Sequence, residues 1–323
     1  MSRRWAARSG MALILTLAAI VLAGGLALYL QSRSLALARA EQAELLQERL
    51  RLAAAEAARE ALWTLASDKD LAVDHLGEDW ALPREVVHAD GLSTRAIVED
   101  AGRFFNWNNL AVSNLATRTS RDILLDLMTF CGDFNPVVRV DALTDFIDAD
   151  DEGTYEAPFY ETGDNPFRPP NRELWAPAEL LRVHQFTADL FRPRPRNGPD
   201  ELFNGDLPLS TVVVPLKLER PIPINVNTAG RDVLMGVVGL QQEAAVNAIL
   251  ALRQMEPLTS LSVLFMANPE LAAALEGTLA TNSSVFRVRA RAAMKDQHSA
   301  VLAWVVREKN GDIRILQWLF EEG

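Results

Sequence analysis

The sequence contains a single cysteine among its 323 residues, Cys131. No intramolecular disulfide can form, so a fold outside the reducing cytoplasm has to be held by packing or by a bound ion. We interpret Cys131 as a small buried hydrophobic residue. The sequence also lacks tandem repeats and low-complexity stretches, which argues against a solenoid and against a disordered tail.

Catalytic signatures are missing as well. The four histidines are scattered without metal-ligand spacing. There is no Gly-x-Ser-x-Gly sequence, no phosphate-binding glycine-rich loop and no CxxC pair. We therefore predict that the chain is not an enzyme.

Acidic residues are absent from the first 30 residues, whose only charges are Arg3, Arg4 and Arg8. The remaining 293 residues hold 29 Lys or Arg and 43 Asp or Glu, a net charge of −14. A body of this charge is repelled by nucleic-acid phosphates and by anionic lipid head groups. Metal cations and other proteins are the partners that it suits.

An uncharged run of 20 residues, 11–30, follows the three arginines. As a helix it spans roughly 30 Å, the thickness of the hydrocarbon core of a bilayer. The basic flank predicts that the N-terminus stays in the cytoplasm and that the acidic body is translocated. The alternative is a cleaved secretory signal peptide, which has a shorter apolar core and a cleavage site of small residues.

The segment after this run favours a membrane anchor over a signal peptide. Residues 31–66 contain 11 alanines, many leucines, and no glycine or proline. Glu48 with Arg51 and Glu56 with Arg59 are opposite charges at i,i+3 spacing, which support a helix. Together with the apolar run, this segment predicts one helix over residues 11–66, roughly 84 Å long.

The rest of the chain mixes helical and strand patterns. Apolar spacing predicts helices over 121–130 and 138–147, with more helix in 173–191 and 230–280. Residues 92–106 are predicted to form two short strands joined by an Ala101-Gly102 turn. Three C-terminal strands are predicted from the alternation over 286–291, the apolar run 300–306 and the segment 313–320 after an Asn310-Gly311 hairpin signal.

The most acidic segment is a loop in which five carboxylates fall within nine residues: Asp148, Asp150, Asp151, Glu152 and Glu156. Oxygen donors at this density suit Ca²⁺, which takes 6–8 oxygen ligands. The loop is not an EF-hand, because its twelfth position is Phe159 where that motif has glutamate. The residues alone leave a calcium site and a solvated acidic loop equally open.

The N-terminal region resembles that of type IV pilins and pseudopilins. A short basic leader ending in glycine precedes a membrane helix that runs straight into an amphipathic extension. The resemblance implies that a prepilin peptidase cleaves between Gly10 and Met11 and methylates the new N-terminus. Most members carry glutamate at the fifth mature position, which is Leu15 here. Its absence is typical of the K-type minor pseudopilin of type II secretion systems.

Four further segments resemble the K-type subunit in order along the chain. They are the IVEDAGRFFN sequence of 97–106, the acidic segment 145–160, the proline-rich run 166–180 and the IPINVNTA sequence that opens 222–234. Each motif is short, but their order and spacing extend the similarity over almost the whole chain.

From this resemblance we expect an α+β fold with a long N-terminal transmembrane helix, a pseudopilin helix-plus-antiparallel-sheet domain and a large inserted all-α domain. The expected leader is 1–10 and the expected transmembrane and amphipathic helix is 11–66. The pseudopilin α/β domain is expected to combine 67–106 with 284–323. The inserted domain, 107–283, is expected to contain a helix-hairpin-helix-like unit.

The same resemblance implies a structural role. We expect a single-pass inner-membrane protein with a periplasmic body, located at the tip of the type II secretion pseudopilus. Its expected partners are the minor pseudopilins I and J, with H as a further candidate. There it is expected to nucleate or cap assembly for protein export across the outer membrane. The resemblance also favours Ca²⁺ in the acidic loop, with Asp148, Asp150, Asp151 and Glu156 as candidate ligands.

Two other interpretations remain open. A helix-hairpin-helix unit over 225–253 is typical of proteins that bind a DNA backbone, which suggests a membrane-anchored DNA-uptake receptor. Residues 225–276 argue against nucleic acid, because they hold two arginines and no lysine against five acids. A generic membrane anchor with an unrelated binding domain is the third interpretation, and it predicts no cleavage after Gly10.

Overall fold

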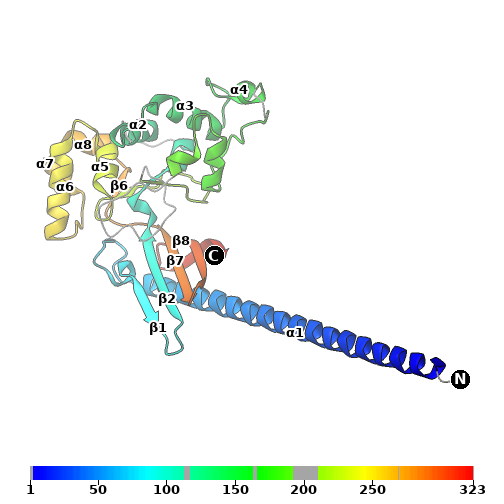
Figure 1. Ribbon diagram of the computed structural model, residues 1–323. Coiled ribbons are helices and arrows are strands. Elements are labelled where there is room, and N and C mark those ends of the chain that lie inside the picture. Colours follow the sequence, from blue (N-terminus) through cyan, green and yellow to red (C-terminus); the bar gives the residue numbers. More distant parts are fainter. Residues whose placement is uncertain (1–2, 113–116, 163–165, 192–209, 268, 323) are drawn as a thin grey trace.

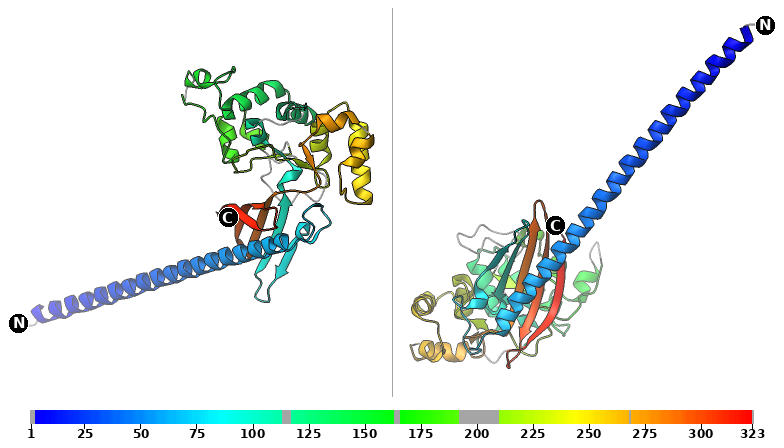
Figure 2. Two further views of the ribbon diagram at one scale, coloured as in Figure 1. Left: turned by 180° about the vertical axis from the view of Figure 1, so that it is seen from behind. Right: turned by 90° about the horizontal axis from the view of Figure 1, so that it is seen from below.

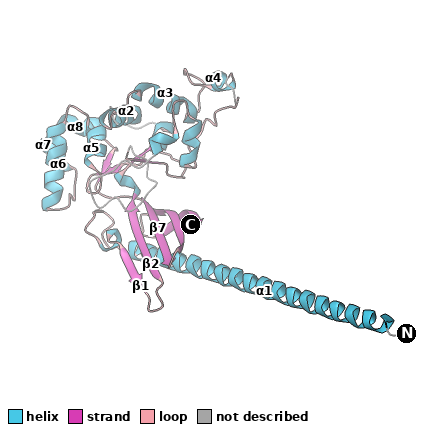
Figure 3. Ribbon diagram, in the orientation of Figure 1, coloured by secondary structure: helices cyan, strands magenta, loops and turns pink. Residues whose placement is uncertain are grey.

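The computed structural model of the chain describes residues 3–112, 117–162, 166–191, 210–267 and 269–322 (Figure 1). Two kinds of structure separate in space. Figure 3 shows the longer strands gathered in one sheet beside the long N-terminal helix, and the shorter helices gathered over one end of that sheet.

The first element is a helix of 64 residues, α1 (Arg3–Ala66). Its stretch Met11–Ala66 is the one helix of the described chain that is long and apolar enough to cross a membrane. Figures 1 and 2 show its N-terminal part projecting from the body as a single rod. The predicted helix over 11–66 is therefore present and ends at the predicted residue.

The sheet has five antiparallel strands in the order β1-β2-β7-β8-β9. Its strands come from both sides of the helical segment along the chain: β1 (Arg84–Val87), β2 (Ser93–Asp100), β7 (Val285–Met294), β8 (Gln297–Arg307) and β9 (Ile313–Glu322). The three predicted C-terminal strands are thus confirmed, and each is longer than its pattern indicated.

The C-terminal part of α1 covers one face of this sheet (Figure 2). It packs mostly small side chains inward: Ala54, Ala58 and Ala61 lie between Leu50 and Leu65 along the buried stripe. Alanines let the helix approach the strands closely. The strands present alternate residues to the same core, among them Val98, Val288, Ala290, Val301 and Ala303.

The predicted hairpin across Ala101-Gly102 is wrong. Strand β2 pairs instead with β1 before it and with β7 far along the chain. After Asp100 the chain enters a short 3-10 helix, η2 (Ala101–Arg103), whose Gly102 amide donates to the Asp100 carboxylate at 2.7 Å. Strand β3 (Phe105–Asn106) then pairs in parallel with β4 (Thr211–Val212).

The predicted hairpin at Asn310-Gly311 is present between β8 and β9. The Glu308 amide donates to the Asp312 carbonyl at 2.8 Å, so three residues form the loop and not two. Gly311 has φ of 89°, the left-handed conformation that such a three-residue loop requires at its last position.

Between β2 and β7 the chain forms a mainly helical insertion with a large hydrophobic core of its own. Its α-helices are α2 (Ser120–Phe130), α3 (Pro136–Ile147), α4 (Ala157–Glu161), α5 (Arg231–Val238), α6 (Glu243–Met255), α7 (Ser262–Ala267) and α8 (Pro269–Ala274). The segment 173–191 forms only 3-10 turns, η4 (Pro177–Arg182) and η5 (Ala188–Phe191). The pair β5 (Ile224–Asn225) and β6 (Leu279–Ala280) adds a second short parallel contact.

The division of the chain into a pseudopilin domain and an inserted domain at residues 106/107 and 283/284 stays a prediction. The helical segment nevertheless lies in sequence between two strands that are neighbours in the sheet, since β2 pairs with β7 over eight residue pairs.

Candidate functional site

The acidic loop lies between α3 and α4. Helix α3 ends where the Asp148 amide donates to the Thr144 carbonyl at 2.9 Å, and α4 starts directly after Glu156. Both ends of the loop are therefore held by helices, so its carboxylates face one another across a short span.

Three of the four predicted ligands come together. Carboxylate oxygens of Asp148, Asp150 and Glu156 lie within 4.8 Å of one another. The fourth, Asp151, is exposed and lies outside this group. The Glu156 side chain is 4% exposed, and neither of its carboxylate oxygens has a hydrogen-bond partner. One oxygen of Asp148 is likewise buried and unpartnered.

Burial and mutual repulsion act on these carboxylates. Burial, followed by the charges of Asp145 and Asp148, raises the pKa of Glu156 to about 7. Burial, followed by the charges of Asp150 and Asp145, raises the pKa of Asp148 to about 6. A bound cation would remove both the repulsion and the unsatisfied oxygens, so this donor set fits a hard cation such as Ca²⁺.

Two residues that sequence reasoning did not select hold the loop. Asp145, at the end of α3, accepts the Tyr155 amide at 2.8 Å, and a side chain at Gly153 would overlap its carboxylate. Asn171 donates to the Asp150 carbonyl at 3.1 Å, while its own amide oxygen is buried without a partner. Asn171 is thus a further candidate oxygen donor at the loop, from the proline-rich run 166–180.

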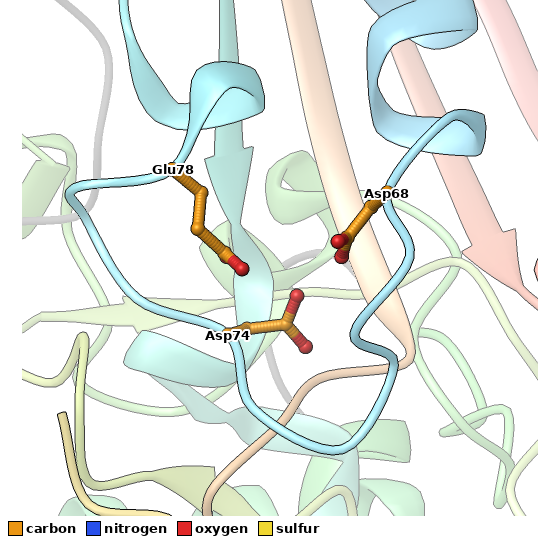
Figure 4. A group of neighbouring side chains, drawn as sticks. All are labelled: Asp68, Asp74 and Glu78. Atoms are coloured by element: carbon orange, nitrogen blue, oxygen red, sulfur yellow. The ribbon is translucent and has the colours of Figure 1, made fainter.

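A second acidic group, Asp68, Asp74 and Glu78, also brings carboxylate oxygens within 4.8 Å of one another (Figure 4). Here protein donors already satisfy the group. Arg307 bridges Asp68 at 2.7 Å and Asp74 at 2.5–2.6 Å. Glu78 accepts the indole N–H of Trp80 at 2.6 Å. We assign this group to the packing of the chain and not to a metal.

The predicted helix-hairpin-helix unit corresponds to α5 and α6, joined at Gly239, which has φ of 114°. The arginines around it bind the chain itself. Arg231 contacts Glu243 at 2.6 Å, and Arg253 donates to two main-chain carbonyls at 2.6 and 2.7 Å. Arg118 donates to the carbonyls of residues 236 and 237 at 2.8 and 2.9 Å. These contacts favour a scaffold role over phosphate binding.

No family model and no curated protein matches the sequence. Among solved structures, the chain is similar to GspK in "The Crystal Structure of the GspK-GspI-GspJ complex from enterotoxigenic Escherichia coli Type 2 Secretion System". The TM-score is 0.66 at 21% sequence identity, over 87% of this chain and 99% of that chain. The chain therefore has the α+β fold of a GspK-like pseudopilin.

Proposed function

We propose that the chain is a K-type minor pseudopilin of a type II secretion system, with a structural and not a catalytic role. One observation carries the proposal: α1 continues without a break from a membrane-length apolar stretch into the helix that covers the sheet. Such a helix anchors the body in the membrane and offers a rod along which other subunits can pack. The likeness to GspK over most of both chains supports the same assignment.

The outward face of α1 carries exposed apolar side chains, which favours contact with the helices of partner subunits. Leu45, Leu52 and Trp63 are 66%, 60% and 70% exposed on the part of α1 that packs on the sheet. At 3.6 residues per turn, Leu45 and Trp63 are about five turns apart and lie on one face, opposite the buried alanines. An exposed tryptophan in line with leucines is typical of a helix–helix contact. The proposed partners are the minor pseudopilins I and J, with H as a further candidate.

The proposed location is the tip of the pseudopilus. Leu15 replaces the glutamate that would need a neighbouring subunit to neutralise it in the bilayer, so the chain suits a position with no subunit above it. The helical insertion lies over one end of the sheet and adds bulk there (Figure 1). We propose that it nucleates or caps the filament, with the body in the periplasm and the N-terminus in the cytoplasm.

Leader processing tests the class of protein. Expressed with a prepilin peptidase, the chain is expected to begin at a methylated Met11, and Gly10→Val is expected to abolish cleavage. Gly24→Val, a glycine in the apolar run with open space around it, is the matched control and should be cut normally. An uncut wild-type chain in cells that process another substrate would overturn the pseudopilin assignment.

Co-purification tests the partners. Trp63→Ala is expected to reduce recovery of the I and J subunits while the melting temperature of the chain stays the same, because the side chain is 70% exposed. Met255→Ala, at an 87% exposed position in the insertion, should leave recovery unchanged. If the wild-type chain, Trp63→Ala and Met255→Ala all recover the I and J subunits equally, the outward face of α1 is not the contact surface.

We further propose that the acidic loop binds Ca²⁺ through Asp148, Asp150 and Glu156, with Asp151 within reach on the same loop. The unpartnered buried oxygens of Glu156 support this proposal. Calcium is expected to raise the melting temperature and EDTA to lower it. Glu156→Gln should lose that response, whereas Glu161→Gln, at an exposed position in α4, should keep it.

A further inference from the structure

The two edges of the five-stranded sheet differ in how they are protected. Strand β1 forms one edge and β9 the other, and within the described residues each pairs with a neighbour on one side only. Figure 2 shows β9, in red, at the outer side of the sheet. The main-chain groups on the free side of an edge strand can pair with a further strand, so proteins usually protect such edges.

Edge β1 is protected. It has four residues, it follows Pro83 directly, and it begins with the charged pair Arg84 and Glu85. Shortness, a proline and exposed charges are features that discourage pairing with a further strand. This edge therefore offers little to an added strand.

Edge β9 is much less protected. It runs over ten residues, Ile313–Glu322, without a proline, and its charged residues stand only near its ends. Its main protective feature is a register shift opposite Trp304 and Val305, but residues 317–322 pair with β8 without interruption. Alternate residues of an antiparallel edge turn both main-chain groups outward, so about three residues of this stretch offer a free N–H and C=O.

Apolar side chains flank the stretch 317–322 on both faces of the sheet. Leu319, which is 41% exposed, lies on the face opposite α1. Trp318 and Phe320 lie on the α1 face, where the guanidinium carbons of Arg59 and Arg51 stand 5.8 and 4.1 Å from their ring centres. An added strand would cover Leu319 and would place its own side chains beside the two rings, which are favourable cross-strand neighbours.

Charge at the end of β9 favours a basic occupant. Glu321 is exposed, lies on the same face as Leu319, and makes no ion pair within the part of the chain that the structure describes. It belongs to a body, residues 31–323, with a net charge of −14. A lysine or arginine directly opposite Glu321 on an added strand would therefore be stabilising.

A second copy of the chain fits this edge poorly. Two β9 strands that pair antiparallel are related by a two-fold axis perpendicular to the sheet. Helix α1 lies along one face of the sheet (Figure 2), so this axis would point the two α1 helices in opposite directions. Both could not then enter the same membrane, and two bodies of net charge −14 would also repel each other.

We propose that the free edge of β9 is a docking site for an extended segment of another protein, which pairs with residues 317–322 as a sixth strand and places a basic side chain opposite Glu321. In this mode of recognition, main-chain hydrogen bonds give affinity and alternate side chains give specificity. Occupation also removes an exposed edge that would otherwise favour aggregation. The inference does not depend on the assignment as a K-type minor pseudopilin.

Peptide binding to the full chain in detergent micelles tests the site. The probe is the peptide Lys-Val-Thr-Val-Thr-Val-Thr-Lys, and a control peptide has glutamate in place of both lysines. The lysine peptide should protect alternate amides of 317–322 from hydrogen exchange, and the glutamate peptide should bind about two- to fivefold more weakly. A lysine peptide N-methylated at its four central residues should not bind. Unchanged exchange of β9 with the lysine peptide would overturn the docking site.

Three variants assign the binding to this edge. Leu319→Lys should weaken binding of the lysine peptide about fivefold with little change in thermal unfolding. Val87→Lys, at a 72% exposed position on β1, is the matched control and should bind as the wild type does. Glu321→Lys should reverse the preference between the lysine and glutamate peptides, which a folding defect would not do.

Two results would contradict the proposal. Equal peptide binding by the wild type and Leu319→Lys would place the peptide elsewhere on the chain. A dimer of the wild-type chain in micelles that Leu319→Lys dissociates, measured by light scattering, would assign the edge to a second copy and not to another protein.

Discussion

Replacing Gly102 by alanine is expected to destabilise the chain by about 2 kcal/mol through one identified overlap. A side-chain carbon at Gly102 would lie 2.5 Å from the Ser283 hydroxyl and 3.0 Å from one Asp100 oxygen. Neither neighbour can move freely, because the Ser283 amide is bonded to Asp74 and the Asp100 carboxylate accepts hydrogen bonds from the insertion. Such overpacking typically costs about 1–3 kcal/mol.

A double-mutant cycle locates the overlap. Ser283→Ala removes the hydroxyl and leaves its carbon at 3.4 Å from the new methyl group, an ordinary contact. Alone it should cost about 1 kcal/mol for the lost contact with Asn225. The pair Gly102→Ala with Ser283→Ala should therefore cost about 1 kcal/mol, well below the sum of the single changes.

Thermal unfolding of the full chain in micelles, followed by tryptophan fluorescence, measures these differences. Gly102→Ala should lower the melting temperature by roughly 4–8 °C, and the double variant by about half as much or less. Gly24→Ala, with open space around it in the apolar run, is the control and should leave the transition in place. Strictly additive single and double variants would refute the overlap with Ser283.

Further predictions concern the acidic loop and Arg253 of the helix-hairpin-helix unit. Calcium has to displace protons from Glu156 and Asp148, so its affinity by calorimetry should rise from pH 5.5 to 7.5 and level off above; a constant affinity would contradict the raised pKa values. Asn171→Ala should weaken calcium binding about tenfold without lowering the calcium-free melting temperature by more than a few degrees. Arg253→Met leaves two main-chain carbonyls without their donor and should cost about 2–3 kcal/mol in thermal unfolding, whereas Arg314→Met on the exposed end of β9 should cost almost nothing.

Patterns that depend on neighbouring residues were predicted correctly from the sequence. The uninterrupted α1, the amphipathic helices α2 and α3, and the C-terminal strands all follow from local periodicity. The edge strand β1 gave no such signal, because all four of its residues are exposed and two of them are charged. Its partner β2 was therefore predicted to form a hairpin across Ala101-Gly102. The sequence indicates a turn at Gly102, but it does not show that the Asp100 carboxylate holds this turn in a 3-10 helix.

The acidic loop was found from its composition, but its ligand set was not fully predictable. The spacing of five acids cannot say which of them point inward, and the structure leaves Asp151 outside the closest group while burying Glu156. Asn171 lies 21 residues from Asp150 and offers an amide oxygen that no acid-counting argument would select. Its place in the proline-rich run was visible only as part of a family resemblance.

The buried contact between Asp100 and the insertion shows that short sequence motifs can mark a long-range contact, which hydrophobic periodicity cannot do. Asp100 and Gly102 belong to the IVEDAGRFFN segment, and Asn225 and Thr228 belong to the IPINVNTA segment, which lie more than 100 residues apart. Their side chains meet in one buried cluster, where the Asp100 carboxylate of the first segment accepts hydrogen bonds from Asn225 and Thr228 of the second. A substitution in either motif leaves a buried polar group without its partner, at a cost of about 1–3 kcal/mol. These motifs are therefore best explained as the residues that fix the helical insertion on the sheet.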